Sequence, residues 1–187
     1  MFEGEKLILA GPNGVGKTTF AETVLGFVPF EGQIIFEGKP VRTENDFKLL
    51  RRKVGYVFQN PDDQLFMPTV YEELAFGPEN LGWNGERIDK IIQTVAERLN
   101  ITHLLERNTF ELSFGQKRLV SIACILTMEP VMLILDEPTN GLDRENWQRV
   151  VDFLKETDKT LMVISHDREF IHSLGWKVLD FPEGLKN

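Results

Sequence analysis

A glycine-rich loop near the start of the chain has the residue types that bind phosphate groups. It spans Gly11–Thr18 (GPNGVGKT) and matches the pattern G-x-x-x-x-G-K-[ST]. The glycines of such a loop let backbone N–H groups surround the phosphates of a nucleotide, and the N-terminus of the next helix adds partial positive charge. Lys17 is expected to neutralise the β- and γ-phosphates, and Thr18 to offer its hydroxyl to Mg²⁺. The alternative, a chance glycine turn, is disfavoured because an apolar segment precedes the loop and a helical pattern follows it.

Two adjacent carboxylates, Asp136 and Glu137, follow the continuous apolar run Val131–Leu135. Such a run is typical of a strand buried on both faces of a parallel sheet, and α/β proteins bind ligands at the carboxyl edge of that sheet. Asp136 is predicted to hold Mg²⁺, mostly through water, and Glu137 to polarise an attacking water as general base. An Asp-Glu pair after a strand is common and by itself is weak evidence for a catalytic site. The phosphate-binding loop in the same chain is what supports the catalytic interpretation.

Apolar, β-rich segments bounded by glycine or proline predict the strands that carry these loops. They lie at 7–10, 33–36, 54–58, 131–135, 161–165 and 177–181. Helical spacing of apolar residues predicts helices between them. These cover 17–25, 46–52, 70–81, 86–99 and the surroundings of 119–126 and 147–154. Strands that alternate with helices predict an α/β fold with a mainly parallel sheet.

Length and composition predict a single globular domain over residues 1–187. Of its 187 residues, 42% are hydrophobic and 27% are charged, and no linker or repeat divides the chain. Residues 1–59 and 119–187 are expected to form a nucleotide-binding core, and residues from about 60 to 118 an inserted helical subdomain. The net charge of −8 argues against nucleic acid as a partner.

The single cysteine and the polar start of the chain bear on its location. Cys124 is the only cysteine, which excludes an internal disulfide and a cysteine-based zinc cluster and fits a reducing compartment. The first residues are too charged for a signal peptide, and no apolar run approaches the roughly 18 to 20 residues of a membrane span. A cytoplasmic protein is expected, and work at a membrane would need another protein to span it.

Further short motifs follow in a definite order along the chain. They are Gln59, Leu112–Gln116 (LSFGQ), Asn140–Asp143 (NGLD) and Ser165–Asp167 (SHD). With the phosphate loop and the carboxylate pair, they resemble the Q-loop, LSGGQ signature, D-loop and switch-histidine loop of the ATP-binding cassette (ABC) ATPases. The resemblance covers nearly the whole chain. It implies a P-loop NTPase fold with a small antiparallel β part and an inserted helical subdomain beside the mainly parallel core.

The resemblance also implies a set of site residues, with ATP and Mg²⁺ as ligands. The catalytic residues would be Lys17, Gln59, Glu137 and His166. The nucleotide would contact Asn13, Gly14, Val15, Gly16, Lys17, Thr18, Thr19, Ser113, Gly115 and Gln116. The metal would be held by Thr18, Gln59 and Asp136. Taken singly, these residues have simpler explanations: Ser113 and Asp143 are typical helix N-caps, and a lone histidine after a strand, such as His166, is more often a packed polar residue.

Family members work as head-to-tail dimers, so a second ATPase subunit, identical or different, is expected. Each ATP would then lie between the phosphate loop of one subunit and the signature of the other. The chemistry of the signature agrees, because the Ser113 hydroxyl, the Gly115 N–H and the helix N-terminus behind them form an anion-binding end. That end is expected to have no phosphate to face within its own chain.

The segments 59–66 (QNPDDQLF) and 68–80 (PTVYEELAFGPEN) narrow the resemblance to the ATPases of energy-coupling-factor importers, which take up cobalt, nickel or vitamins. In such systems this region docks on coupling helices of an integral membrane subunit, which would hold the chain on the inner face of the cell membrane. Apolar residues in a loop suggest contact with a partner, and Gln64-Leu65-Phe66 is therefore predicted to touch one.

Two departures from the family pattern leave an alternative function open. Phe114 replaces the middle glycine of the signature, and family members usually carry two more strands upstream, with an aromatic residue that stacks on adenine. The chain is therefore expected to be an N-terminally shortened cassette. A regulatory module that binds ATP with little turnover is the alternative, and ATPase activity with and without Glu137→Gln discriminates the two. A DNA-repair or chromosome-organising ABC ATPase would need a long coiled coil between Gln59 and Ser113, where only a small helical insertion fits.

Overall fold

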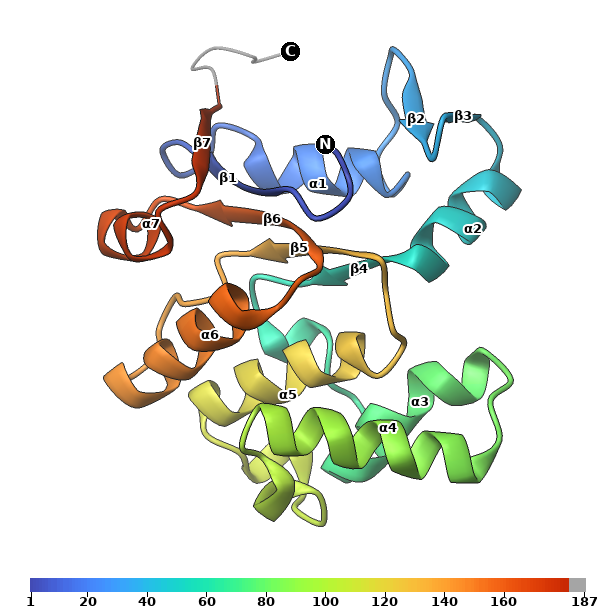
Figure 1. The fold of residues 1–187 in the computed structure, drawn as a ribbon, viewed down its shortest axis with the longest axis vertical. Coiled ribbons are helices and arrows are strands. Elements are labelled where there is room, and N and C mark those ends of the chain that lie inside the picture. The colour runs from blue at the N-terminus through green and yellow to red at the C-terminus, as the bar shows by residue number, and fades with distance from the viewer. Residues whose placement is uncertain (182–187) are drawn as a thin grey trace.

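The computed structural model describes residues 1–181 and contains a five-stranded parallel sheet (Figure 1). The strands lie in the order β4-β5-β6-β1-β7. Their bounds are Lys6–Ala10 for β1, Val54–Val57 for β4, Met132–Asp136 for β5, Thr160–Ser165 for β6 and Lys177–Asp180 for β7. A separate antiparallel pair contains β2 (Ile34–Phe36) and β3 (Lys39–Val41). The predicted α/β class, with a mainly parallel sheet and a small antiparallel part, is confirmed.

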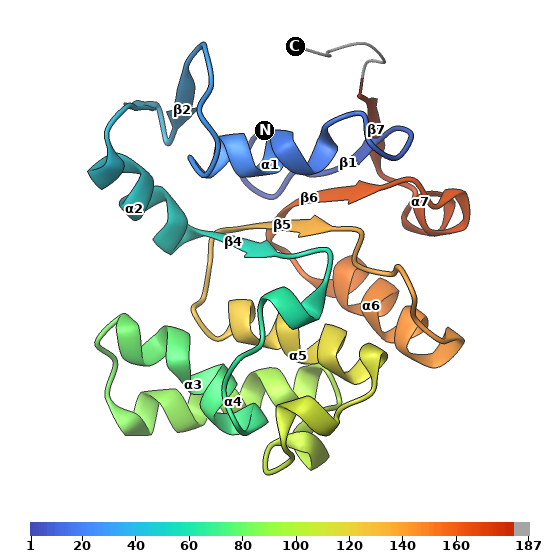
Figure 2. The same ribbon diagram turned by 180° about the vertical axis from the view of Figure 1, so that it is seen from behind.

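Helices cover both faces of the sheet, as Figures 1 and 2 show from opposite sides. Alternate strand residues point to opposite faces, so Leu7 and Leu9 lie in one core and Ile8 in the other. The first core is covered by α1 (Lys17–Val24) and α2 (Glu44–Lys53), and the second by α5 (Phe114–Leu126), α6 (Arg144–Glu156) and α7 (Arg168–Leu174).

A second helical layer, formed by α3 (Val70–Asn80) and α4 (Gly85–Arg98), packs on the side of α5 away from the sheet (Figure 1). The amphipathic helix α4 buries Ile88, Ile92 and Val95 there. Short 3₁₀ helices connect the layers at Pro61–Asp63, Thr102–Leu104 and Thr109–Glu111. Helix α5 is continuous and packs between α3 and the sheet, so the boundary expected between residues 118 and 119 falls inside it.

Strand β3 and helix α7 were not predicted from the sequence, and the predicted strands differ from the observed ones by one residue at one or both ends. Strand β3 is three residues long and contains Pro40, and α7 is seven residues long. Both are too short to show a clear apolar period. Strand β5 runs one residue further than predicted, because Asp136 pairs with Ile164 of β6. Asp136 is therefore the last residue of the strand, and Glu137 is the first residue of the turn.

Over residues 1–181, none of the helices combines the length and the apolar character that a membrane crossing requires.

Candidate active site

Four predicted parts of the site follow the carboxyl ends of parallel strands. They are the phosphate loop, the Gln59 segment, Glu137 and His166. The register places Ala10 of β1 beside Ser165 of β6, and Asp136 of β5 beside Ile164 of β6. Residues that follow these strands therefore emerge at one edge of the sheet, which is where open α/β sheets bind ligands.

The phosphate loop curls around the ammonium group of Lys17. This side chain is 6% exposed, and its Nζ donates hydrogen bonds to the carbonyl oxygens of Gly11 (2.7 Å) and Pro12 (2.9 Å). Gly14 and Gly16 have φ angles of +79° and +103°, which side-chain-bearing residues rarely adopt. Helix α1 starts at Lys17, directly after Gly16. The loop thus holds one cation at a helix N-terminus, an arrangement suited to binding phosphate.

The remaining loop residues form an accessible rim around this cation. Asn13, Gly14 and Thr19 are exposed, and Val15 and Gly16 are half-buried. A nucleotide can therefore reach the backbone of the loop from solvent.

Thr18 and Asp136 meet beside the phosphate loop, although 118 positions separate them in the chain. The Thr18 hydroxyl donates to Oδ2 of Asp136 at 2.6 Å, and the Tyr56 hydroxyl lies 3.4 Å from the same oxygen. Asp136 is fully buried, and its Oδ1 has no hydrogen-bond partner among the described residues. Burial raises the pKa of the Asp136 carboxyl, the hydrogen bond from Thr18 opposes this, and the nearby Glu137 charge adds to it.

This pair fits a Mg²⁺ site. A hydroxyl and a carboxylate with one unpartnered oxygen are hard oxygen ligands of the kind that Mg²⁺ selects, and Mg²⁺ commonly takes its other ligands from phosphates and water. In residues 1–181, no three His, Cys, Asp or Glu side chains gather in a group that could hold a metal ion by themselves. The residues therefore suit a metal that arrives with a nucleotide.

Glu137 and His166 form a second pair. Oε1 of Glu137 lies 2.6 Å from Nδ1 of His166, and its Oε2 accepts a hydrogen bond from Ser165 Oγ at 3.2 Å. Glu137 has a φ of +45°, a conformation that is strained for a residue with a side chain. Glu137 lines a cavity of about 320 Å³, which is also lined by Thr139, Asn140, Gly141, His166 and Asp167.

Gln59 lies in a neighbouring pocket that also contains Thr18. This pocket, of about 410 Å³, is lined by Thr18, Glu22, Tyr56, Phe58, Gln59, Asn60, Asp63, Phe114 and Asn140. The structure thus brings Gln59 close to the Thr18–Asp136 pair. It also brings in Phe114, the residue that departs from the family signature, whose ring lies against Gly141 of the same chain.

The signature residues Ser113, Gly115 and Gln116 lie at the start of α5, away from the phosphate loop. Ser113 Oγ accepts from the backbone N–H of Gln116 (3.3 Å), and Oε1 of Gln116 accepts from the backbone N–H of Ser113 (3.0 Å). This is a capping box, and the predicted N-cap roles of Ser113 and Asp143 are confirmed. Ser113 and Gln116 line a polar cavity of about 320 Å³ whose wall, within the described residues, contains none of the phosphate loop.

A neighbouring asparagine explains why residue 115 is a glycine. A Cβ atom added to Gly115 would lie only 2.5 Å from Nδ2 of Asn146, and that amide donates to Oδ2 of Asp143 at 2.8 Å. Asn146 therefore lies against Gly115 of the signature while it donates to the carboxylate of Asp143. Sequence reasoning missed it because Asn146 matches no motif and lies 31 positions beyond Gly115 in the chain.

The loop from Gln64 to Phe66 only partly matches its predicted partner contact. Phe66 is 55% exposed, but Leu65 is 7% exposed and packs in the core of its own chain. Gln64 is engaged with its own chain, because its Nε2 donates to the Ser121 carbonyl oxygen at 2.7 Å. The prediction is therefore wrong for Leu65, because alternation along the loop turns this apolar side chain inward.

Comparisons with known proteins agree with this geometry. Residues 1–140 match the sequence family described as ABC transporter. The chain is 45% identical over 171 residues to a Brucella suis protein assigned as an ABC transporter ATP-binding protein, covering 91% of this chain and 72% of that protein. It is 43% identical over 179 residues to an uncharacterized ABC transporter ATP-binding protein of Haemophilus influenzae, covering 95% and 82%.

Solved structures give the same result. The chain superposes on cbiO1 of Clostridium perfringens, described as part of the ABC transporter complex cbiONQ, with a TM-score of 0.80 and 39% identity over 89% of this chain and 69% of that one. A dimeric ATP-binding cassette, MJ0796, solved with ADP and phosphate, gives a TM-score of 0.83 at 24% identity over 92% and 79% of the two chains, and supports the fold. With the match of residues 1–140 and these relatives, the chain belongs to the ABC transporter family of ATP-binding proteins and is an ABC ATPase with the P-loop NTPase fold.

Proposed function

We propose that this chain is the ATP-binding and hydrolysing subunit that powers a membrane importer through ATP-driven head-to-tail dimerisation. The observation that carries the catalytic part is the meeting of Lys17, Thr18, Asp136, Glu137 and His166 at one edge of the sheet. An energy-coupling-factor importer of metal ions or vitamins is the proposed type. The 39% identity to cbiO1, a part of the cbiONQ transporter complex, supports that type.

Hydrolysis would use positioning and charge rather than covalent chemistry by the protein. Lys17 is proposed to balance the charge of the β- and γ-phosphates from its place inside the loop. Glu137 accepts a proton from the attacking water, and Gln59 orients that water from the adjoining pocket. The His166 ring, held through Nδ1 by Glu137, contacts the γ-phosphate from the wall of the same cavity.

Thr18, Asp136 and Gln59 are proposed to hold Mg²⁺. When bound, this ion neutralises charge that develops on the phosphate oxygens during transfer. The buried Oδ1 of Asp136 would gain its partner in this way, and a nearby cation would favour the charged form of the carboxyl that burial disfavours.

The dimer is proposed because Ser113 and Gln116 of the signature line a different cavity from the phosphate loop of their own chain, although Phe114 shares a pocket with Thr18. The Ser113 hydroxyl and the N-terminus of α5 form an anion-binding end. A second subunit, placed head to tail, would bring the γ-phosphate of its bound ATP to that end. Its own signature would contact the γ-phosphate bound by this chain.

Mixing a Lys17→Ala chain with a Ser113→Ala chain is expected to recover activity that neither chain has by itself. In the mixed dimer, the intact loop of the Ser113→Ala chain meets the intact signature of the Lys17→Ala chain, which restores one site per dimer. ATP turnover is measured on dimers isolated with two different affinity tags. Isolated mixed dimers without recovered turnover would contradict the sharing of one ATP between two chains.

The control for this experiment is Thr69→Ala. Ser113 also caps α5, and loss of such a cap costs about 1 kcal/mol. Thr69 caps α3 with the same reciprocal capping box. Its replacement is therefore expected to lower stability by a similar amount and to leave turnover intact, which separates the capping role of Ser113 from its role in the site.

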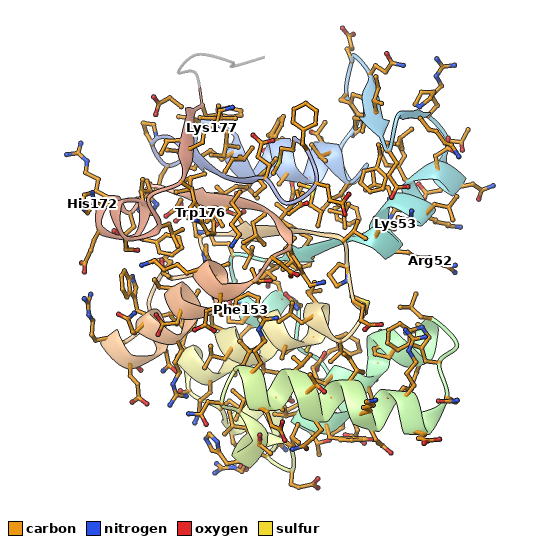
Figure 3. The ribbon with its side chains drawn as sticks, in the orientation of Figure 1. Arg52, Lys53, Phe153, His172, Trp176 and Lys177 are labelled. Atoms are coloured by element: carbon orange, nitrogen blue, oxygen red, sulfur yellow. The ribbon has the colours of Figure 1, made fainter. Side chains whose placement is uncertain are left out.

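The transporter subunit is proposed to dock in a groove between α2, α3 and α5. The groove, of about 400 Å³, is lined by Arg51, Arg52, Gln64, Phe66, Glu73, Phe76, Gly77, Asn80, Leu81, Cys124, Ile125 and Met128. Two of its lining residues, Phe66 and Phe76, are exposed and form an edge-to-face aromatic pair with ring centroids 4.9 Å apart. Arg52 lies on its rim, at the end of α2 above α3 (Figure 3).

Glu73 holds this aromatic pair in place. Its carboxylate is 4% exposed and accepts hydrogen bonds from the backbone N–H groups of Phe66 (2.8 Å) and Met67 (2.6 Å). Burial raises the pKa of Glu73, and the two hydrogen bonds oppose that shift. The loop thus presents Phe66 from a fixed backbone, and an amphipathic helix with apolar residues and an acidic end would complement the groove.

Replacing Phe66 by serine is expected to release the chain from its membrane partner without lowering its own ATPase activity. Loss of a buried aromatic anchor costs about 2 kcal/mol or more at an interface, roughly thirtyfold in affinity. The tagged chain is purified from detergent-solubilised membranes, and the integral membrane proteins that accompany it are identified and quantified by mass spectrometry.

The matched control is Phe2→Ser, since Phe2 is 84% exposed and lies outside the groove. It should keep the same membrane proteins at parental levels. Equal recovery with Phe66→Ser would contradict docking at this groove, and the absence of any multi-spanning protein from the parental chain would contradict the transporter role.

A further inference from the structure

Arg118 is a fully buried arginine in the helix that carries the signature. Its side chain is 0% exposed, and its guanidinium donates to the carbonyl oxygen of Phe58 at 2.6 Å and to that of Gln59. Burial lowers the pKa of Arg118 to about 10, so the group remains charged at neutral pH. A buried charge is costly unless it is well hydrogen-bonded. These two charge-assisted bonds are therefore strong constraints on the residues that accept them.

A second side chain ties the same segment to the same helix. Gln64 donates from Nε2 to the Ser121 carbonyl oxygen of α5 at 2.7 Å, and its Oε1 accepts from the backbone N–H of Phe58 at 3.3 Å. Phe58 is thus held through its carbonyl by Arg118 and through its N–H by Gln64. The residues after β4 are therefore held against α5 by hydrogen bonds from two side chains that are buried or half-buried, Arg118 and Gln64, in addition to a surface ion pair.

Phe114 extends this arrangement to the signature. It precedes Arg118 by one helical turn, and its ring centroid lies 5.8 Å from the guanidinium carbon. The same ring lines the pocket of Gln59 and Thr18. The aromatic residue that replaces a signature glycine therefore covers the buried charge that holds Gln59.

We infer that Arg118 is a positioning residue that makes the Gln59 segment and the signature helix move as one body. The inference rests on the proposed function, in which Gln59 serves the nucleotide of its own chain and Ser113 serves the nucleotide of the partner. Arg118 then joins a part of one ATP site to a part of the other. A displacement of Gln59 by nucleotide is passed along α5 to the signature at the opposite site.

The test uses dimers that have one working site. One chain carries Lys17→Ala and supplies only a signature to that site, and the other chain supplies its phosphate loop and Gln59. Arg118→Met is placed either in the first chain or in the second, and the two kinds of dimer are isolated with different affinity tags. Methionine keeps the length and apolar character of the buried stem but donates no hydrogen bond.

Both placements are expected to lower turnover at saturating ATP at least fivefold, while the ATP concentration for half-maximal rate changes less than threefold. In the first chain the loss reaches the working site through the signature, and in the second through Gln59. A loss from only one placement would overturn the inference, because Arg118 would then support one motif and not join two. A parental single-site dimer without activity would instead count against the proposed function.

A conservative variant and a control separate positioning from stability. Arg118→Lys keeps the charge and can reach one carbonyl oxygen, so it should recover at least half of the lost activity in both placements. If Arg118→Met does not fold, Arg118→Gln, which is uncharged and too short to reach both carbonyl oxygens, replaces it in the test with the same expected loss. Lys117→Met removes only a surface ion pair to Asp62, on the same helix and the same segment. This control should change turnover less than twofold, and a loss equal to that of Arg118→Met would overturn the assignment to Arg118.

Discussion

Replacing Lys17 by alanine is expected to lower ATP hydrolysis by about 10³-fold and to weaken nucleotide binding sharply. Removal of a single preorganised donor to a developing charge typically costs about 10²–10³ in rate, and Lys17 also carries the positive charge inside the loop. Its ammonium group already lies on the carbonyl oxygens of Gly11 and Pro12, within the curve that phosphates would occupy. The Lys17 side chain is therefore already ordered before phosphate binds, and it loses little conformational freedom on binding. Alanine removes both the charge and this preordered group.

Turnover and nucleotide affinity are measured with Mg·ATP, by phosphate release and by fluorescence of a nucleotide analogue. Lys6→Ala is a matched control, because Lys6 likewise donates to two carbonyl oxygens, those of Leu154 and Lys155, but outside the site. Each variant loses hydrogen bonds worth about 1 kcal/mol apiece. Wild-type activity in Lys17→Ala would refute the catalytic site, and an equal loss in Lys6→Ala would show that stability, and not phosphate binding, is the cause.

Replacing Glu137 by glutamine is expected to stop hydrolysis, leave ATP binding intact and trap an ATP-bound dimer. General base catalysis contributes about 10²–10⁴-fold, and an amide cannot take a proton from the attacking water. Glutamine has the same shape and can still reach His166 and Ser165, so the cavity keeps its form. The nucleotide would continue to join the two chains because its cleavage is prevented.

Size-exclusion chromatography with Mg·ATP should show a dimer peak for Glu137→Gln, together with a loss of phosphate release. Glu129→Gln is the matched control, because Glu129 also has a positive φ, of 52°, but lies at an exposed ion pair with Arg87. It should retain turnover. A wild-type enzyme with negligible turnover, unchanged by Glu137→Gln, would favour a regulatory ATP-binding module. A monomer under saturating ATP would contradict dimerisation between identical chains.

The sequence by itself determined the fold class and the order of the motifs. Short-range patterns are sufficient for this, because a run such as Leu133–Leu135 records burial on both faces of a strand and a spacing such as Ile88, Ile92 and Val95 records one face of a helix. Parallel strands then require that residues after their carboxyl ends share an edge. The approach of Gln59, Glu137 and His166 to the phosphate loop follows from that geometry alone.

Only the tertiary structure decided which side chains touch one another across that edge. Thr18 reaches Asp136, Asn146 closes over Gly115, and Arg118 reaches the carbonyl oxygens of Phe58 and Gln59. For the last contact, the sequence indicated only that Arg118 lies on the buried face of its helix, because Arg118 precedes the buried residue Ile122 by one helical turn. Its partners were not visible there.

The physical reason is that local patterns report only the spacing of residues along one element. Contacts between elements depend on register and packing angle, and a shift of one residue changes which side chain faces inward. Leu65 and Phe66 show this directly: both are apolar and adjacent, yet the first is 7% exposed and packs in the core while the second is 55% exposed in the groove. Composition predicted that this loop contains apolar contacts, and only the packing of the loop against α3 and α5 decided which residue faces outward.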